Sequence, residues 1–177
     1  YFKNFTPVKY QPYLNDIIVR MQDMVGRWLR GEVILVFVVG LLSLIGLRIL
    51  DVKYFLVLAL LAGIFELIPY LGPIISAIPA VFIASAESPW KGLAVIILFW
   101  LIQQMENHII VPKVMQKAIG LNPIIVILVI LIGARLQGFI GILVAVPTAA
   151  ALSVLVKDIF EKGRGDITEE EQKAQSE

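Results

Sequence analysis

The residues in this sequence whose types could do chemistry are a few polar side chains set inside long apolar runs. Glu66 follows the apolar stretch YFLVLALLAGIF, and the segment QQMENH at residues 103–108 interrupts another apolar run. A charged side chain at the centre of a membrane helix costs about 2.5–3.5 kcal/mol on insertion scales, so a carboxylate kept there suggests function. Glu66 and Glu106 are therefore predicted to handle charge, as sites for a proton or a cation. The alternative for Glu66 is a position close enough to the membrane interface to reach water.

The polar segment QQMENH is predicted to present several side chains on one helix face. Gln103, Glu106 and Asn107 follow one another at i, i+3 and i+4, which is helical spacing. Three interpretations stay open. The stripe lines a polar path, or it joins helices by hydrogen bonds of about 0.6 kcal/mol each on average, or it marks the interfacial end of a span, since Lys113 and Lys117 follow closely.

The stretch ELIPYLGPIISAIPA at residues 66–80 places strong helix breakers beside Glu66. Backbone groups freed by proline cannot face lipid, so they must be buried in protein or line a watery cavity. Broken membrane helices expose N–H and C=O groups that bind ions or polar solutes; the alternative is a set of proline kinks with no binding role. The predicted transport pathway comprises Glu66, Pro69, Gly72, Pro73, Gln103, Glu106, Asn107 and Pro112. A predicted gating or broken-helix element comprises Pro79, Gly138, Gly141 and Pro147.

The composition indicates an integral membrane protein. Of the 177 residues, 59% are hydrophobic and 16% are charged, whereas soluble domains carry about 25% charged residues. The formal net charge of +1 gives no sign of nucleic-acid binding. The chain has no cysteine and a single histidine, so no metal site is expected. No catalytic motif such as HExxH, GxSxG or a phosphate-binding glycine loop is present, so an enzyme is not expected.

Hydrophobic patterning predicts an all-α, polytopic helical membrane protein. An irregular N-terminal stretch precedes an amphipathic helix from Asp16, which lies at the membrane surface or packs on its own protein. The segment 73–86 is too short for a simple span, which favours a re-entrant or discontinuous helix. The other predicted membrane helices cover residues 33–50, 54–68, 93–112, 122–134 and 138–156. The predicted regions are 1–30, a first membrane repeat 31–92, a second membrane repeat 93–157, and a charged, frayed cytoplasmic tail 158–177.

The two membrane regions show signs of an internal repeat. Gly63, Gly72 and Pro79 correspond to Gly133, Gly141 and Pro147 at offsets of 70, 69 and 68 residues. If each repeat crosses the membrane three times, the second is inverted relative to the first. Inverted repeats with proline-interrupted helices are typical of secondary transporters.

The basic residues predict which side of the membrane each loop occupies. In a six-crossing arrangement, eight basic residues fall on one side and four on the other, which makes the first side cytoplasmic and places both ends of the chain there. If the proline-containing segments are re-entrant, the ends still share a side. The eight are Arg20, Arg27, Arg30, Lys113, Lys117, Lys157, Lys162 and Arg164, and the four are Arg48, Lys53, Lys91 and Arg135.

Several of these stretches resemble the autoinducer-2 exporter family of bacterial permeases. The resemblance covers roughly residues 17–157. It rests on WLRGE at 28–32, GIFELIPYLGPIISAIPA at 63–80, QQMENHIIVPKVM at 103–115 and GFIGILVAVP at 138–147. It implies a multi-pass protein of the bacterial inner membrane with both ends cytoplasmic, of which this chain, starting at Tyr1, looks like the C-terminal half. It also implies a homo-oligomer, with pentamers and an elevator-like movement proposed for the family.

Three functions from two classes remain as expectations. By resemblance, the first is export of a small polar solute by alternating access, and the second is sodium or lithium exchange for protons. No cofactor is expected beyond coupling to protons or sodium. The third is a membrane scaffold that transports nothing and assembles through small residues such as Gly63 and Ala80. The expected partners are the lipid bilayer, further copies of the chain, and a small polar solute or a monovalent cation.

Overall fold

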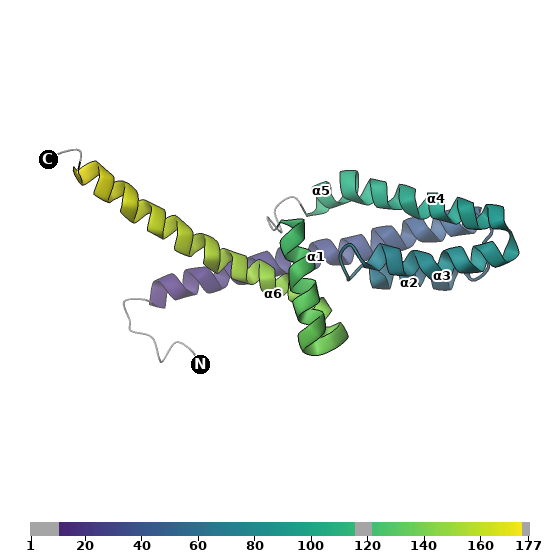
Figure 1. Ribbon diagram of the computed structural model, residues 1–177, viewed down its shortest axis with the longest axis horizontal. Helices are drawn as coiled ribbons and strands as arrows, with labels where there is room; N and C mark the ends of the chain where they lie inside the picture. Colours follow the sequence, from purple (N-terminus) through teal and green to yellow (C-terminus); the bar gives the residue numbers. More distant parts are fainter. Residues whose placement is uncertain (1–10, 116–121, 175–177) are drawn as a thin grey trace. The chain divides into compact units, whose positions relative to one another are not determined.

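The computed structural model describes residues 11–115 and 122–174, and all regular structure in that part of the chain is helical. This confirms the prediction of an all-α protein. The helices are α1 (Gln11–Ile49), α2 (Phe55–Phe65), α3 (Gly72–Glu87), α4 (Pro89–Met105), the π-helical segment Glu106–Ile110, α5 (Val111–Val114) and α6 (Pro123–Ala174) (Figure 1).

Among the residues that the structure describes, three helical stretches are long and apolar enough to cross a membrane: Asn15–Ile49, Pro89–Val114 and Ile124–Val156. The helices α2 and α3 are apolar but shorter, at 11 and 16 residues. At 1.5 Å per residue they extend only about 16 Å and 24 Å, less than the hydrocarbon core of about 30 Å. The chain is therefore a membrane protein in which two short apolar helices accompany the long ones.

The structure differs from the sequence expectations at both ends. The amphipathic segment and the first predicted span form one continuous helix, α1, which already includes residues 11–15. Between Asp16 and Val33 the sequence has no proline and two glycines, Gly26 and Gly31, and single glycines weaken a helix interior without ending it. At the other end, α6 continues through Ala174, so the described part of the expected frayed tail is helical. The irregular stretch expected over residues 1–10 lies outside the described residues.

The chain divides into two compact units, Tyr1–Gly26 with Gly120–Glu177, and Arg27–Ile119. In the second unit, α3 packs against both α2 and α4. Its apolar core draws on α1, α2, α3 and α4 and comprises Leu47, Val52, Leu58, Ala80, Ala84 and Val95. Because α4 contributes to this core, the unit extends past the boundary that was predicted between residues 92 and 93. The internal repeat stays a prediction.

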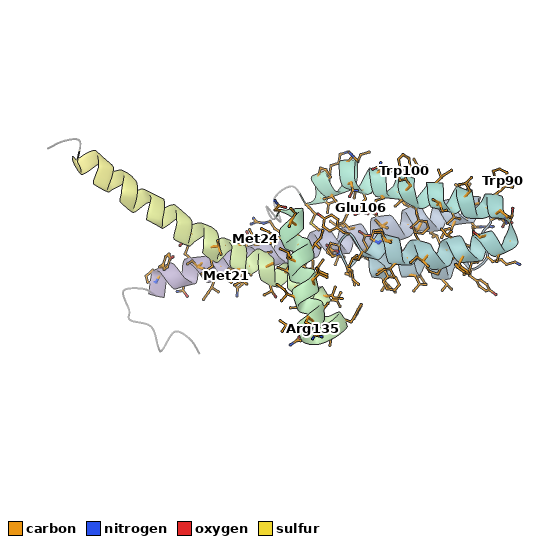
Figure 2. All side chains as sticks on the ribbon, in the orientation of Figure 1. Met21, Met24, Trp90, Trp100, Glu106 and Arg135 are labelled. Atoms are coloured by element: carbon orange, nitrogen blue, oxygen red, sulfur yellow. The ribbon has the colours of Figure 1, made fainter. Side chains whose placement is uncertain are left out.

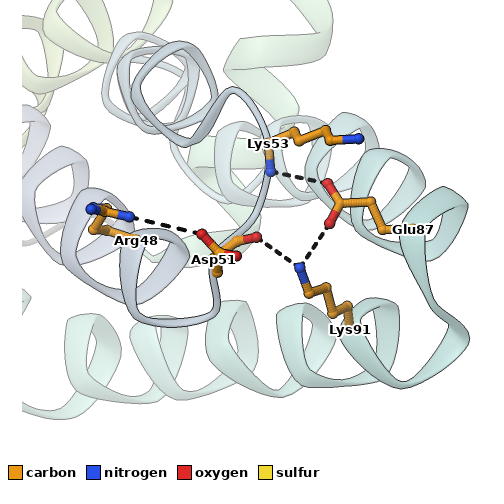
Figure 3. Close-up of polar contacts among 5 residues, drawn as sticks. All are labelled: Arg48, Asp51, Lys53, Glu87 and Lys91. Carbon is orange, nitrogen blue, oxygen red and sulfur yellow. Dashed lines mark hydrogen bonds and ion pairs between the residues drawn. The ribbon is translucent and has the colours of Figure 1, made fainter.

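A polar network fastens one end of the second unit, as Figure 3 shows. The Lys91 ammonium donates to the Asp51 carbonyl oxygen at 2.8 Å and pairs with the Glu87 carboxylate at 2.7 Å. The backbone N–H of Lys53 donates to the same carboxylate at 3.2 Å. Hydrogen bonds, first from Lys91 and then from Lys53, lower the pKa of Glu87 below its usual value. The network therefore ties the α1–α2 turn to the α3–α4 turn through an ionised Glu87.

In the first unit, α6 is broken at Gln137 and Gly138, and Figure 1 shows two arms leaving a sharp bend. Gln137 has φ −137° and ψ 18°, and Gly138 has φ 60° and ψ −134°, a combination that glycine adopts almost alone. A Cβ on Gly141 would overlap the carbonyl oxygen of Gly133, so the arms approach too closely there for any side chain. The break falls between the two helices predicted for residues 122–134 and 138–156.

Candidate functional site: a buried carboxylate cluster

Three carboxylates are buried in the second unit, where apolar side chains dominate. Glu32, Glu66 and Glu106 are 2%, 3% and 7% exposed. They come from α1, from the residue after α2, and from the π-helical segment after α4. Burying a charged group is costly unless it is paired and hydrogen-bonded, so three carboxylates in one interior need a physical account.

Helix α1 places Glu32 on its buried face. Trp28, Leu35 and Val39 are buried at three- and four-residue spacing from it, and Leu47 continues the same stripe. Gly31 lies beside it, and a Cβ there would come within 2.6 Å of the Met115 sulfur. The glycine therefore allows α1 to approach the segment that follows Glu106.

A tight turn between α2 and α3 positions Glu66. The apolar helix ends at Phe65, and the Glu66 N–H still donates to the Ala62 carbonyl at 3.2 Å. Gly72 then begins α3, and a Cβ on Gly72 would overlap the Phe65 carbonyl oxygen. Pro73 stands in the first turn of α3, where its missing N–H leaves no backbone bond unmade. The glycine and the proline thus turn the chain back at the point where Glu66 is buried.

The π-helical segment Glu106–Ile110 positions Glu106. The Val111 N–H donates to the Glu106 carbonyl, five residues back, in place of the α-helical partner. Pro112 supplies a cause, because it has no N–H and its ring clashes with the carbonyl four residues earlier. Figure 2 shows Glu106 on the side of α4 that faces the other helices, and its side chain is 7% exposed. Trp90 and Trp100, on the same helix, are 79% and 59% exposed. Such π-helical insertions occur frequently at functional sites.

A hydrogen bond from the neighbouring turn of α4 holds the Glu106 side chain. The Gln103 amide donates to Glu106 Oε2 at 3.2 Å and to Asn107 Oδ1 at 3.4 Å. Glu32 and Glu66 are buried in the same unit. In the described residues, the buried oxygen Glu66 Oε2 has no hydrogen-bond partner.

The structure brings together only part of the pathway set predicted from the sequence. Gln103 and Glu106 are hydrogen-bonded, Glu66 is buried in the same unit, and Gly72 and Pro73 shape the turn that follows Glu66. Pro69 is half-buried in that turn, while Asn107 and Pro112 are exposed. Pro79 lies inside α3.

The other residues of the predicted gating element belong to the first unit. Gly138 and Gly141 lie at and just after the break in α6, and Pro147 lies inside its second arm. A groove of about 470 Å³ is lined there by residues that include Gly133, Gly141 and Thr148. In both units a glycine stands where the chain turns back, against a carbonyl oxygen of the preceding helix.

Sequence reasoning missed Glu32. The signal was present, because Glu32 is the one carboxylate at the head of the apolar run VILVFVVGLLSLIGL and continues the spacing of Trp28 and Leu35. No group of three or more histidine, aspartate or glutamate side chains in the described part of the chain is arranged to hold a metal ion. The three buried carboxylates therefore do not form a metal-binding geometry.

Comparisons with known proteins agree with a membrane transport protein. Residues 1–161 match the model of the AI-2E family transporter. The candidate transport protein YrrI of Bacillus subtilis (strain 168) is 30% identical over 85% of this chain and 43% of its own length. The AI-2 transport protein TqsA of Escherichia coli (strain K12) is 29% identical over 84% of this chain and 42% of its own length. The chain thus spans less than half the length of these two relatives. Because the family model matches most of the residues of this chain, the chain belongs to the AI-2E transporter family.

Proposed function

We propose that this chain forms part of a permease that moves a small polar solute out across the bacterial inner membrane by alternating access. The observation that carries the proposal is the burial of two carboxylates, Glu66 and Glu106, inside a unit of apolar helices. Intramembrane ionisable residues are retained chiefly along substrate and ion pathways. The proposed pathway comprises Glu66, Pro69, Gly72, Pro73, Gln103, Glu106, Asn107 and Pro112.

The proposed solute is of the autoinducer-2 type. The support is the name of one relative, TqsA, which is an AI-2 transport protein. A small polar solute needs hydrogen-bond partners along its path, and the Gln103 amide and the carboxylates offer donors and acceptors. The breaks beside Glu66 and at Gly138 are the proposed gating elements, with Pro79, Gly141 and Pro147. The proposed assembly is a homo-oligomer with both ends of the chain in the cytoplasm.

A second candidate is exchange of sodium or lithium for protons. The observation that favours it is that carboxylates, rather than hydroxyl or amide groups, dominate the polar centre. An antiporter needs a group that releases a proton when it accepts a cation, and a carboxylate can do both.

One experiment on the full-length protein separates the two candidates. Sealed liposomes would be loaded with labelled autoinducer-2 and a pH-sensitive dye, and a sodium or lithium gradient would then be imposed. Protein-dependent loss of the label supports the permease, whereas cation-driven proton movement without loss of the label supports the antiporter. If neither flux exceeds that of protein-free liposomes, the transport proposal is wrong.

A further inference from the structure

Two turns meet at one end of the second unit and form a rim made of residues 48–54 and 87–91. Helices α1 and α3 end at this rim, and α2 and α4 begin there. Two of the stretches that are long and apolar enough to span a membrane, Asn15–Ile49 and Pro89–Val114, also have one end at the rim. The rim therefore lies where apolar helices leave the membrane, at the level of the lipid headgroups.

Two aromatic side chains project from the rim. Tyr54 and Trp90 are 69% and 79% exposed, and Figure 2 shows Trp90 at this end of the helices. Tyrosine and tryptophan are enriched at membrane–water interfaces, because each has an apolar ring and a polar O–H or N–H group. The two exposed rings agree with a rim at headgroup level.

The charges of the rim are not balanced. It carries the basic residues Arg48, Lys53 and Lys91 against the acidic residues Asp51 and Glu87, so one positive charge is in excess. The Lys91 ammonium pairs with the Glu87 carboxylate at 2.7 Å, and Arg48 pairs with Asp51 at 3.8 Å. In the part of the chain that the structure describes, the Lys53 side chain makes no hydrogen bond or ion pair, and Figure 3 shows its ammonium outside the network. The Lys53 ammonium is therefore available to an anion from outside the chain.

We propose that the rim binds the phosphate of an anionic phospholipid, with Lys53 and Arg48 as its cationic ligands and the rings of Tyr54 and Trp90 beside the lipid. The Arg48 guanidinium lies 5.3 Å from the centroid of the Phe55 ring, a cation–π contact that helps to orient it. A guanidinium has five N–H donors, so donors remain for a phosphate beside the contact with Asp51. This lipid site goes beyond the proposed function, because it requires neither a solute nor a coupling ion.

The position of the rim favours a lipid phosphate over a free phosphate ion. Lys53 and Arg48 are exposed, and contacts between exposed charges in water are weak and screened by salt. A phospholipid is held at headgroup level by its acyl chains, so its phosphate meets the two cations at a high effective concentration. The excess positive charge of the rim also favours an anionic headgroup over a zwitterionic one, whose own cation it would repel.

Photocrosslinking tests the site without a transport assay. The full-length protein would be placed in phosphatidylcholine nanodiscs that contain phosphatidylglycerol with a photoactivatable group next to its phosphate, and mass spectrometry would locate the labelled residues. We expect label on the rim, and unlabelled phosphatidylglycerol should compete it away. Lys53→Gln and Arg48→Gln should each lower the label on the rim about fivefold, the factor that one basic residue contributes near an anionic surface.

Two further variants separate the charge from other effects. Lys53→Arg keeps the charge and should retain the label on the rim, whereas the same loss as in Lys53→Gln would contradict a charge effect. Lys113→Gln removes an exposed basic residue of α5, outside the rim, and should leave the label unchanged. Wild-type labelling of the rim in both Lys53→Gln and Arg48→Gln would overturn the proposal. Equal labelling by a phosphatidylcholine probe, or competition by excess inorganic phosphate as effective as that by phosphatidylglycerol, would also overturn it.

Discussion

Glu66, which directly follows α2, and Glu106, at the start of the π-helical segment, are both buried in the interior of one helical unit, at 3% and 7% exposed. Each is placed by a local irregularity: a glycine-closed turn for Glu66 and an insertion before Pro112 for Glu106. Regular helices would carry both side chains to other positions. The interruptions in these helices therefore place both carboxylates in the interior.

Removing the Pro112 ring should convert the π-helical segment to α-helix. In Pro112→Ala the new N–H can bond to the carbonyl of His108, so the extra residue at Glu106–Ile110 is no longer required. Glu106 would then rotate away from Glu66, and we expect transport to fall while the protein still folds. A cryo-electron microscopy structure of the variant checks the helix, and a retained Val111 to Glu106 backbone bond would contradict the prediction. Pro89→Ala, at the start of α4, is the matched control.

Gln103→Leu should destabilise the second unit, because it removes the donor to Glu106 Oε2. A buried acceptor left without a partner costs about 1–3 kcal/mol. The measurement is thermal unfolding of the full-length protein in lipid, compared with Gln104→Leu at the next position along α4. Equal unfolding temperatures for the two variants would show that the Gln103 hydrogen bond contributes nothing to stability.

Gly72→Ala should disrupt the α2–α3 turn. The added methyl group would overlap the Phe65 carbonyl oxygen, which is backbone and cannot move aside without shifting the turn. Overpacking of this kind costs about 1–3 kcal/mol. Gly40→Ala is the control, because its nearest neighbour would lie 3.6 Å away, in ordinary contact. Circular dichroism during heating should show a lower midpoint for Gly72→Ala only, and a loss of the same size in both would rule out this mechanism.

The polar network at the opposite end should weaken in acid. The pKa of folded Glu87 lies below its ordinary value of 4.5, so its contribution is fully present above that pH and is lost as the pH falls through the folded pKa. The Lys53 amide, which donates to Glu87, reports the change through its hydrogen-exchange protection factor. We expect that protection to drop below pH 4.5, and Glu87→Ala should show the lower protection already at neutral pH. Constant protection across the acid range would mean that Glu87 does not hold the turn.

The sequence predicted the fold class and most of the polar centre for clear physical reasons. Long apolar runs indicate membrane helices, and Glu66, Gln103 and Glu106 stood out as polar residues within them. Helix ends were accurate to one residue at Gly72 and Pro123, whereas the helix predicted to run to residue 68 ends at Phe65 and the one predicted from residue 93 begins at Pro89. The expected break before residue 33 is absent, because no residue there is incompatible with a helix.

What the sequence did not predict depends on contacts between distant segments. Glu32 heads an apolar run, but its burial becomes visible only in the folded unit. The π-helical insertion was equally hidden, because a proline that follows a polar segment also fits a kink or a helix end. Gly72 and Gly141, which correspond in the predicted repeat, each lie close to the carbonyl oxygen of an earlier residue, Phe65 and Gly133 respectively. This similarity is in keeping with the predicted repeat.

The most direct test of the account measures flux through the full-length protein in sealed liposomes for Glu66→Gln, Glu106→Gln and the control Glu87→Gln. Labelled autoinducer-2 and internal pH would be followed together, with equal protein content verified in each preparation. The account predicts that both cluster variants lose the flux seen in the wild type and that Glu87→Gln retains it. Wild-type flux in both Glu66→Gln and Glu106→Gln would contradict the central claim that the buried carboxylate pair lies in the transport pathway.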